Sequence, residues 1–190
     1  MKRIFMIAVV CTLLFACNDN KKKDDDKKTD DGKTTMSSDG KKPATELLDL
    51  SAAEPVKKSF AAFAKADVDG MTADYDDNIR YTWSGGDSLI GKQAVKDYYN
   101  GRWKLIQSLS YSNEIALPLQ VNESQQPQAA PNGKWVLYWA MVDVTYKNGK
   151  NLKFWMHNVN HFNDGGKIDF IGQYIDRHPI MEATKELMPK

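Results

Sequence analysis

The chain opens with an apolar run and then changes abruptly to a long polar stretch. Residues 4–16 are apolar except for Thr12, and Lys2 and Arg3 precede them. A membrane-spanning helix needs about 20 apolar residues, so this run is too short and instead has the length and basic flank of an export signal. Residues 18–42 are mostly Lys, Asp, Asn, Gly, Ser and Thr. They predict a disordered tether, because they cannot bury enough apolar surface to offset chain entropy.

The hydrophobic spacing after residue 42 predicts one domain, residues 43–190, that begins with helices. Ser51 with Glu54 three residues later is a capping-box pattern, and apolar residues then recur at helical spacing. Asp67 is a second candidate cap, and Gly91 precedes a third helical pattern. The expected helices cover about 52–66, 67–75 and 94–103.

The later apolar segments alternate with a period of two and predict strands. Turn signals at 84–87, 148–149 and 164–166 separate them, and the long loop 120–133 predicts either a variable surface loop or a mobile lid. Helices followed by an antiparallel meander predict an α+β domain with the helices packed on one sheet face. The expected strands cover about 79–83, 109–119, 135–146, 150–162 and 168–175.

The end of the first apolar run resembles the lipobox of bacterial lipoproteins. It reads Leu14-Phe15-Ala16-Cys17, although Phe15 is bulkier than the usual residue there. The resemblance implies that residues 1–16 are a signal peptide, that Cys17 is lipidated, and that residues 17–42 tether the domain to the cell envelope. Several acyl chains give lasting anchoring, at the outer membrane on its periplasmic or surface side. The charged cluster at 21–26 resembles the surface-export signal of some Bacteroidetes lipoproteins.

Charge and cysteine content exclude several function classes. Without Lys2 and Arg3 the chain has 24 basic and 25 acidic side chains, a net charge of −1. No basic surplus exists to neutralise a phosphate backbone, so we expect no nucleic-acid partner. Cys11 leaves with the signal and Cys17 is modified, so the domain has no thiol for a disulfide or a metal. We expect no cofactor.

Three segments between residues 54 and 176 resemble the nuclear transport factor 2-like superfamily and its SnoaL-like branch. They lie at 66–83, 89–99 and 160–168, and the last is similar to the family pattern Phe-x-Phe-x-Asp-Gly-Lys-Ile, with Asn160 in place of the first Phe and one extra turn residue. The resemblance implies a cone, in which a curved antiparallel or mixed sheet wraps over three N-terminal helices and leaves an apolar pocket. Many relatives are homodimers through the outer sheet face. Members include isomerases, cyclases, dehydratases and domains that only bind, so the fold does not decide the function.

Strand parity and aromatic content select the candidate pocket residues, because alternate strand residues face opposite sides of a sheet. The aromatic members could wall a site for a flat apolar ligand or could be plain core. The predicted pocket residues are Tyr81, Trp83, Tyr99, Trp103, Trp139, Met141, Asn158, Asn160 and Gln173.

The resemblance also identifies where a catalytic carboxylate would lie. Ketosteroid isomerases carry one on the first strand, at the position of Trp83, and SnoaL-like cyclases carry one on the last strand, at the position of Gln173. Neither side chain accepts a proton at physiological pH. Asp143 is the remaining candidate general base if it faces the pocket, where desolvation would raise its pKa; otherwise it lies on the outer face.

The two nearby histidines do not predict a metal site. His157 and His161 are four residues apart on one strand, roughly 13 Å at ~3.3 Å per residue, too far to share an ion.

Three functions stay open. The first is a membrane-tethered module that binds a small apolar ligand in a cavity near ~300 Å³, or dimerises, without catalysis. The others are an isomerase-, cyclase- or dehydratase-type enzyme using Asp143, and an assembly lipoprotein with an apolar outer patch around Trp155 and Val159.

Overall fold

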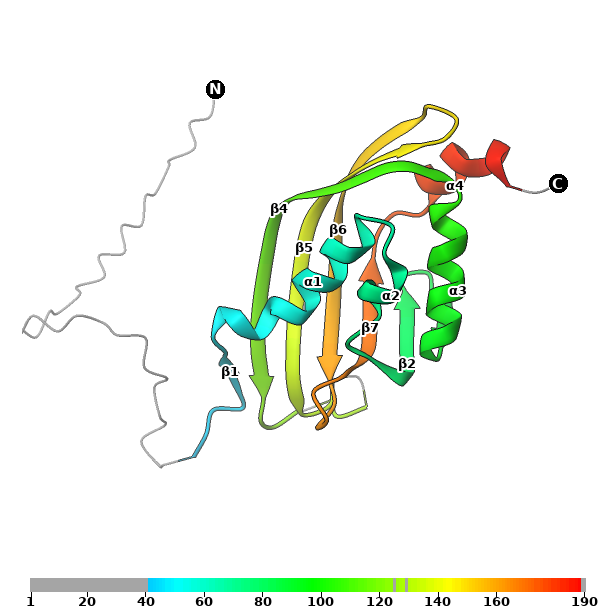
Figure 1. The fold of residues 1–190 in the computed structure, drawn as a ribbon. Coiled ribbons are helices and arrows are strands. Elements are labelled where there is room, and N and C mark those ends of the chain that lie inside the picture. Colours follow the sequence, from blue (N-terminus) through cyan, green and yellow to red (C-terminus); the bar gives the residue numbers. More distant parts are fainter. Residues whose placement is uncertain (1–40, 125, 129, 189–190) are drawn as a thin grey trace, which may run out of the picture. The chain divides into compact units, whose positions relative to one another are not determined.

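The computed structural model describes residues 41–124, 126–128 and 130–188 (Figure 1). The predicted signal peptide, Cys17 and the tether up to residue 40 lie outside these residues. None of the helices that the structure describes has the length and apolar character needed to span a bilayer.

The domain is built on a curved, mixed sheet of seven strands, which confirms the α+β prediction (Figure 1). The strands are β1 (Thr45–Leu47), β2 (Tyr75–Trp83), β3 (Ser88–Ile90), β4 (Ile106–Val121), β5 (Gly133–Tyr146), β6 (Asn151–Phe162) and β7 (Ile168–Tyr174). Their order is β1-β4-β5-β6-β7-β2-β3. The predicted antiparallel meander is β4 to β7, and β2 adds to its end in parallel with β7.

The helices pack against the inner face of this sheet. They are η1 (Leu50–Ala53), α1 (Glu54–Phe63), α2 (Val68–Met71), α3 (Lys92–Trp103), α4 (His178–Thr184) and η2 (Lys185–Leu187). Figure 1 shows α1 lying across the long strands of the meander. Its Phe60 ring stacks on Tyr138 of β5 at 4.5 Å and meets Tyr111 of β4 edge-on at 5.3 Å.

The first two helices differ from the sequence-based expectation at their ends. Asp49, not Ser51, caps the first segment, because its carboxylate accepts the Ser51 backbone N–H at 2.9 Å. Asp67 caps α2 as predicted, through the N–H of Gly70 at 2.7 Å. That helix nevertheless ends at Met71 and not near residue 75, and the Thr72 hydroxyl bonds back to the Val68 carbonyl at 3.0 Å. Such a bond competes with helix continuation.

Two glycines of the third helix give a matched stability prediction. Gly101 lies inside α3 with open space around its Cα, so Gly101→Ala should raise the free energy of unfolding by about 0.5–1 kcal/mol. Gly91 precedes α3 with φ +90° and ψ 143°, a conformation that side chains rarely adopt, so Gly91→Ala should lower it. Urea denaturation of both variants measures the difference, and a loss of stability in both would contradict it.

Candidate functional site

A cavity of about 120 Å³ lies between the inner sheet face, α1, α3 and α4. It is smaller than the ~300 Å³ of common ligand pockets. An engineered cavity of about 150 Å³ binds benzene, so the space is near the size of one ring. Aromatic and aliphatic side chains form most of its wall. The polar members of its lining are Ser59, Tyr75, Tyr81, Trp83, Tyr98, Tyr99, Arg102, Tyr111, Tyr146, Gln173 and Arg177.

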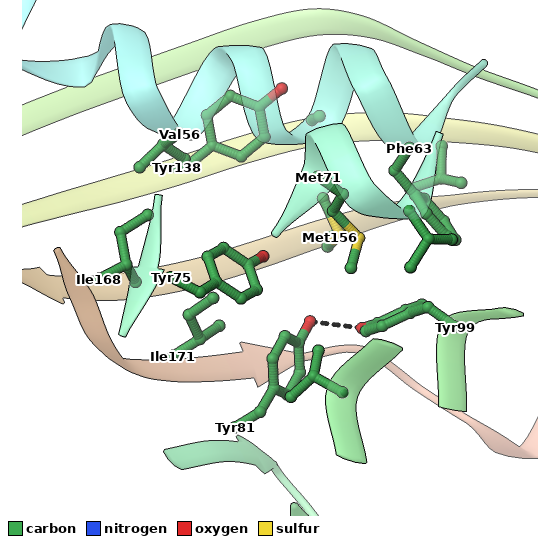
Figure 2. Close-up of a cluster of buried hydrophobic side chains, with 14 of the residues drawn as sticks. Val56, Phe63, Met71, Tyr75, Tyr81, Tyr99, Tyr138, Met156, Ile168 and Ile171 are labelled. Carbon is green, nitrogen blue, oxygen red and sulfur yellow. Dashed lines mark hydrogen bonds between the residues drawn. The ribbon is translucent and has the colours of Figure 1, made fainter. Parts of the chain in front are cut away.

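Tyrosines are the most frequent polar residues of the cavity lining, and several of their hydroxyls are held by hydrogen bonds. The Tyr99 hydroxyl donates to the Tyr81 hydroxyl at 2.6 Å, the dashed contact in Figure 2. The Ser59 hydroxyl donates to the Met71 carbonyl at 2.8 Å and lies 3.1 Å from the Tyr75 hydroxyl. Because Ser59 has one proton and uses it on Met71, Tyr75 donates to Ser59. The phenols are therefore held in fixed orientations by one another and by α1.

These phenols stay neutral at physiological pH. Burial raises the pKa of Tyr75 to about 12. Burial also raises the pKa values of Tyr81, Tyr99 and Tyr111 well above the ordinary value. The hydroxyls can donate and accept hydrogen bonds, but they are not tyrosinate bases near neutral pH.

Asn158 is the described side chain that has two buried polar atoms without a hydrogen-bond partner, while Thr82 and Trp103 have one each. Asn158 is 1 % exposed, and neither its amide nitrogen nor its amide oxygen has a hydrogen-bond partner among the described residues. It lies beside Tyr81, where it offsets a small part of the burial effect on the pKa of that phenol. Tyr81 accepts the proton of Tyr99, so its own proton is available to another acceptor. Tyr81 lines the cavity, and the Asn158 amide lies beside it outside the lining.

The two positions where relatives carry carboxylates are in direct contact. Trp83 Nε1 donates to Gln173 Oε1 at 2.9 Å, and Gln173 Nε2 lies 3.2 Å from Met156 Sδ. Both Trp83 and Gln173 line the cavity, as predicted. In the part of the chain that the structure describes, no carboxylate and no imidazole belongs to the lining.

Three predicted residues of β5 do not reach the cavity. Trp139, Met141 and Asp143 alternate with inward-facing Val142 and Val144 and so lie on the outer face of the sheet. The Asp143 carboxylate accepts from Asn151 at 2.8 Å and pairs with Lys153 at 3.0 Å. These bonds lower its pKa, which is opposite to the direction that a desolvated base needs. The prediction of Trp139 and Met141 as pocket residues is wrong, and of the two placements left open for Asp143 the outer face holds, so Asp143 cannot act on a ligand in this cavity.

Two further predicted residues lie outside the lining, Trp103 partly buried and Asn160 buried. Trp103 packs edge-on against Phe63 at 5.6 Å. The Asn160 side chain bonds to the sheet, where its amide nitrogen donates to the Val136 carbonyl at 3.0 Å. Asn158 is likewise outside the lining and acts on it through Tyr81. Of the predicted set, Tyr81, Trp83, Tyr99 and Gln173 line the cavity.

The cavity also has lining residues that the sequence analysis missed. Tyr75 has the same strand parity as Tyr81, so a longer first strand would have identified it. Arg177 and Met181 come from the C-terminal segment around α4, whose seven residues are too short for a periodic signal. The described residues of loop 120–133 do not line the cavity, so they form no lid over it.

The histidines lie apart, as the strand spacing predicted. His157 stacks between Trp139 at 4.4 Å and Tyr174 at 5.6 Å on the outer face. His161 is buried, with Nδ1 2.6 Å from Asp169 and Nε2 3.1 Å from the Asn132 carbonyl. Among the described residues no three metal-binding side chains of the His, Cys, Asp or Glu type come together.

Comparisons with known proteins agree with this architecture. Residues 56–170 match the sequence profile of the SnoaL-like domain family. Among curated proteins none matches the sequence.

Three solved structures illustrate the fold. A proposed isomerase from Bacillus subtilis is 20 % identical, with a TM-score of 0.56 over 70 % of this chain and 92 % of its own. A proposed polyketide cyclase from Pseudomonas putida is 15 % identical, with a TM-score of 0.56 over 70 % and 96 %. An NTF2-like protein of unknown function from Burkholderia pseudomallei is 17 % identical, with a TM-score of 0.53 over 71 % and 98 %. At these identities the likeness shows the fold alone.

Proposed function

This chain belongs to the SnoaL-like domain family, and we propose that its domain binds a small, largely apolar, single-ring molecule in the cavity without transforming it. The observation that carries the proposal is the pairing of the unsatisfied Asn158 amide with the available Tyr81 hydroxyl beside an aromatic-walled space. Buried polar groups that lack partners are costly in a protein interior. A ligand hydroxyl or carbonyl that reaches the Tyr81 hydroxyl, which lines the cavity beside Asn158, would complete the network.

The absence of a proton acceptor supports binding over catalysis. Isomerase and cyclase chemistry depends on a positioned group that can take a proton near neutral pH. The described lining offers neutral phenols, the amide of Gln173 and two guanidinium groups, and none of these does so. The neighbours with catalytic descriptions share only the fold with this chain, and function resides in the site rather than the fold.

The proposal includes attachment to a membrane and self-association. The short apolar run, its terminal Cys17 and the polar stretch after it support a lipid-anchored protein of the cell envelope. Exposed aromatic side chains on the outer sheet face support a homodimer, since Trp155 and Tyr174 are 50 % and 52 % exposed.

Enlarging one cavity side chain tests the binding proposal. Val142 lines the cavity, so Val142→Phe should fill it and weaken binding of benzyl alcohol by at least about tenfold, or ~1.4 kcal/mol. Met141→Phe is the matched control, because Met141 is next along β5 and faces outward. Ligand-observed NMR titration measures affinity, and near-ultraviolet circular dichroism checks the fold.

Two outcomes would contradict the proposal. If Val142→Phe binds benzyl alcohol as tightly as the parent protein, the ligand occupies another site. If the parent binds none of a set comprising benzyl alcohol, phenol and benzamide, the cavity is not a site for single-ring molecules. Recovery of chemically altered probe would remove the non-catalytic part of the proposal.

A further inference from the structure

We infer that the ligand of this cavity carries a carboxylate, and that Arg102 binds it at the mouth. The inference rests on the proposed binding function and specifies its ligand class as small aromatic carboxylates. The lining residues differ in solvent exposure: several tyrosines are buried, Arg102 and Arg177 are half-buried, and Met181 is exposed. The two arginines therefore belong to the open side.

The two guanidinium groups differ in how their charge is compensated. Arg177 pairs with Asp87 and lies 5.0 Å from the Trp83 ring centre. Asp87 supplies the counter-charge for Arg177, and the hydrogen bond from Arg177 lowers the pKa of the Asp87 carboxyl. For Arg102, no carboxylate within ion-pairing distance is found in the described ranges of the chain. Arg102 is thus the cavity cation that has no counter-charge there.

The neighbour of Arg102 does not supply that charge either. Arg102 lies beside the Tyr146 phenol, whose pKa is raised because burial disfavours its ionised form more than the guanidinium favours it. The phenol therefore stays neutral in the physiological range. A half-buried charge interacts more strongly than one in bulk water, because the local dielectric is lower. The planar guanidinium also fits a carboxylate through two parallel hydrogen bonds.

A structural role for Arg102 would have a different signature. The residue lies in the last turn of α3, where a cation also interacts favourably with the helix dipole. That interaction would change helix stability and would not depend on the charge of a ligand. A comparison of two ligands that differ in charge but hardly in shape separates the two roles.

Benzoate and benzamide are that pair of probes. The parent protein should bind benzoate at least tenfold more tightly than benzamide, and the difference should shrink as salt concentration rises. Arg102→Gln should abolish the preference, because it should weaken benzoate binding by more than it changes benzamide binding. Arg102→Lys keeps the charge but loses the two-pronged geometry, so it should retain part of the preference. Arg80→Gln is the control, since Arg80 is exposed on β2 and outside the lining.

Calorimetric titration of the full set gives outcomes that separate the two proposals. Equal affinity of the parent for benzoate and benzamide overturns the carboxylate inference and leaves the binding function standing. Failure of the parent to bind either probe overturns both. An equal loss of both affinities in Arg102→Gln means that the residue only shapes the wall, and this outcome also overturns the inference.

Discussion

Asn158→Leu is expected to raise the free energy of unfolding of the ligand-free protein by about 1–3 kcal/mol, because it removes a buried amide that has no hydrogen-bond partner among the described residues. Leucine is close to asparagine in shape and adds apolar contact in the same space. The variant should at the same time weaken binding of a probe that carries a hydroxyl or carbonyl. Stability and binding would then change in opposite directions, as they do where a site keeps a costly group for function.

Asn160→Leu is the matched control for this prediction. Asn160 is on the same strand and face and is 2 % exposed, but its amide donates to the Val136 carbonyl. Its replacement should lower the free energy of unfolding, since a satisfied bond is lost and the carbonyl loses its partner. Chemical denaturation without ligand compares the two variants. A destabilised Asn158→Leu would mean that the amide is satisfied in solution, for example by a bound water.

Ile79→Ala should lower the free energy of unfolding by about 2–5 kcal/mol, the range found when a large aliphatic side chain is removed from a core. Ile79 is fully buried on β2, two residues before Tyr81 on the same face. The loss should therefore also loosen the strand that positions the Tyr81 hydroxyl.

Ile90→Ala is the control for that variant. Ile90 pairs with Arg80 on the neighbouring strand β3 and is 63 % exposed, so the same truncation there should change stability by less than about 1 kcal/mol. Urea midpoints with unchanged slopes measure both effects. A similar small loss in both variants would show that the core around β2 relaxes to fill the space.

The fold was predictable from sequence because most elements have one clear apolar face. The inward faces of β2, β6 and β7 followed from parity and are confirmed, with Tyr81, Asn158 and Gln173 all buried. Strand β5 is different, since both of its faces are apolar and alternation alone cannot orient it. Asp143 has the same parity as Trp139 and Met141 and is the polar residue that indicates the outer face, but the sequence left its placement open while those two were assigned to the pocket.

The parts of the site that sequence could not predict depend on contacts between distant residues. The hydrogen bond from Trp83 to Gln173 joins residues that are 90 positions apart in the sequence, and no local sequence pattern predicts such a pair. The short helix α4 and the strands β1 and β3 carry too few residues for a periodic signal. Whether Arg102 has a counter-charge likewise became visible only once its spatial neighbours were known.

The parallel pairing of β2 with β7 sets the order in which this site can be completed. Strand β2 is made early in synthesis, but its partner comes last in the sheet, and pairings of such long sequence separation form slowly. Until then Tyr81 and Trp83 sit on an unpaired edge, open to association with other chains. A nascent or truncated polypeptide that stops before residue 168 therefore lacks the β7 part of the cavity wall and leaves this edge of β2 without its partner strand.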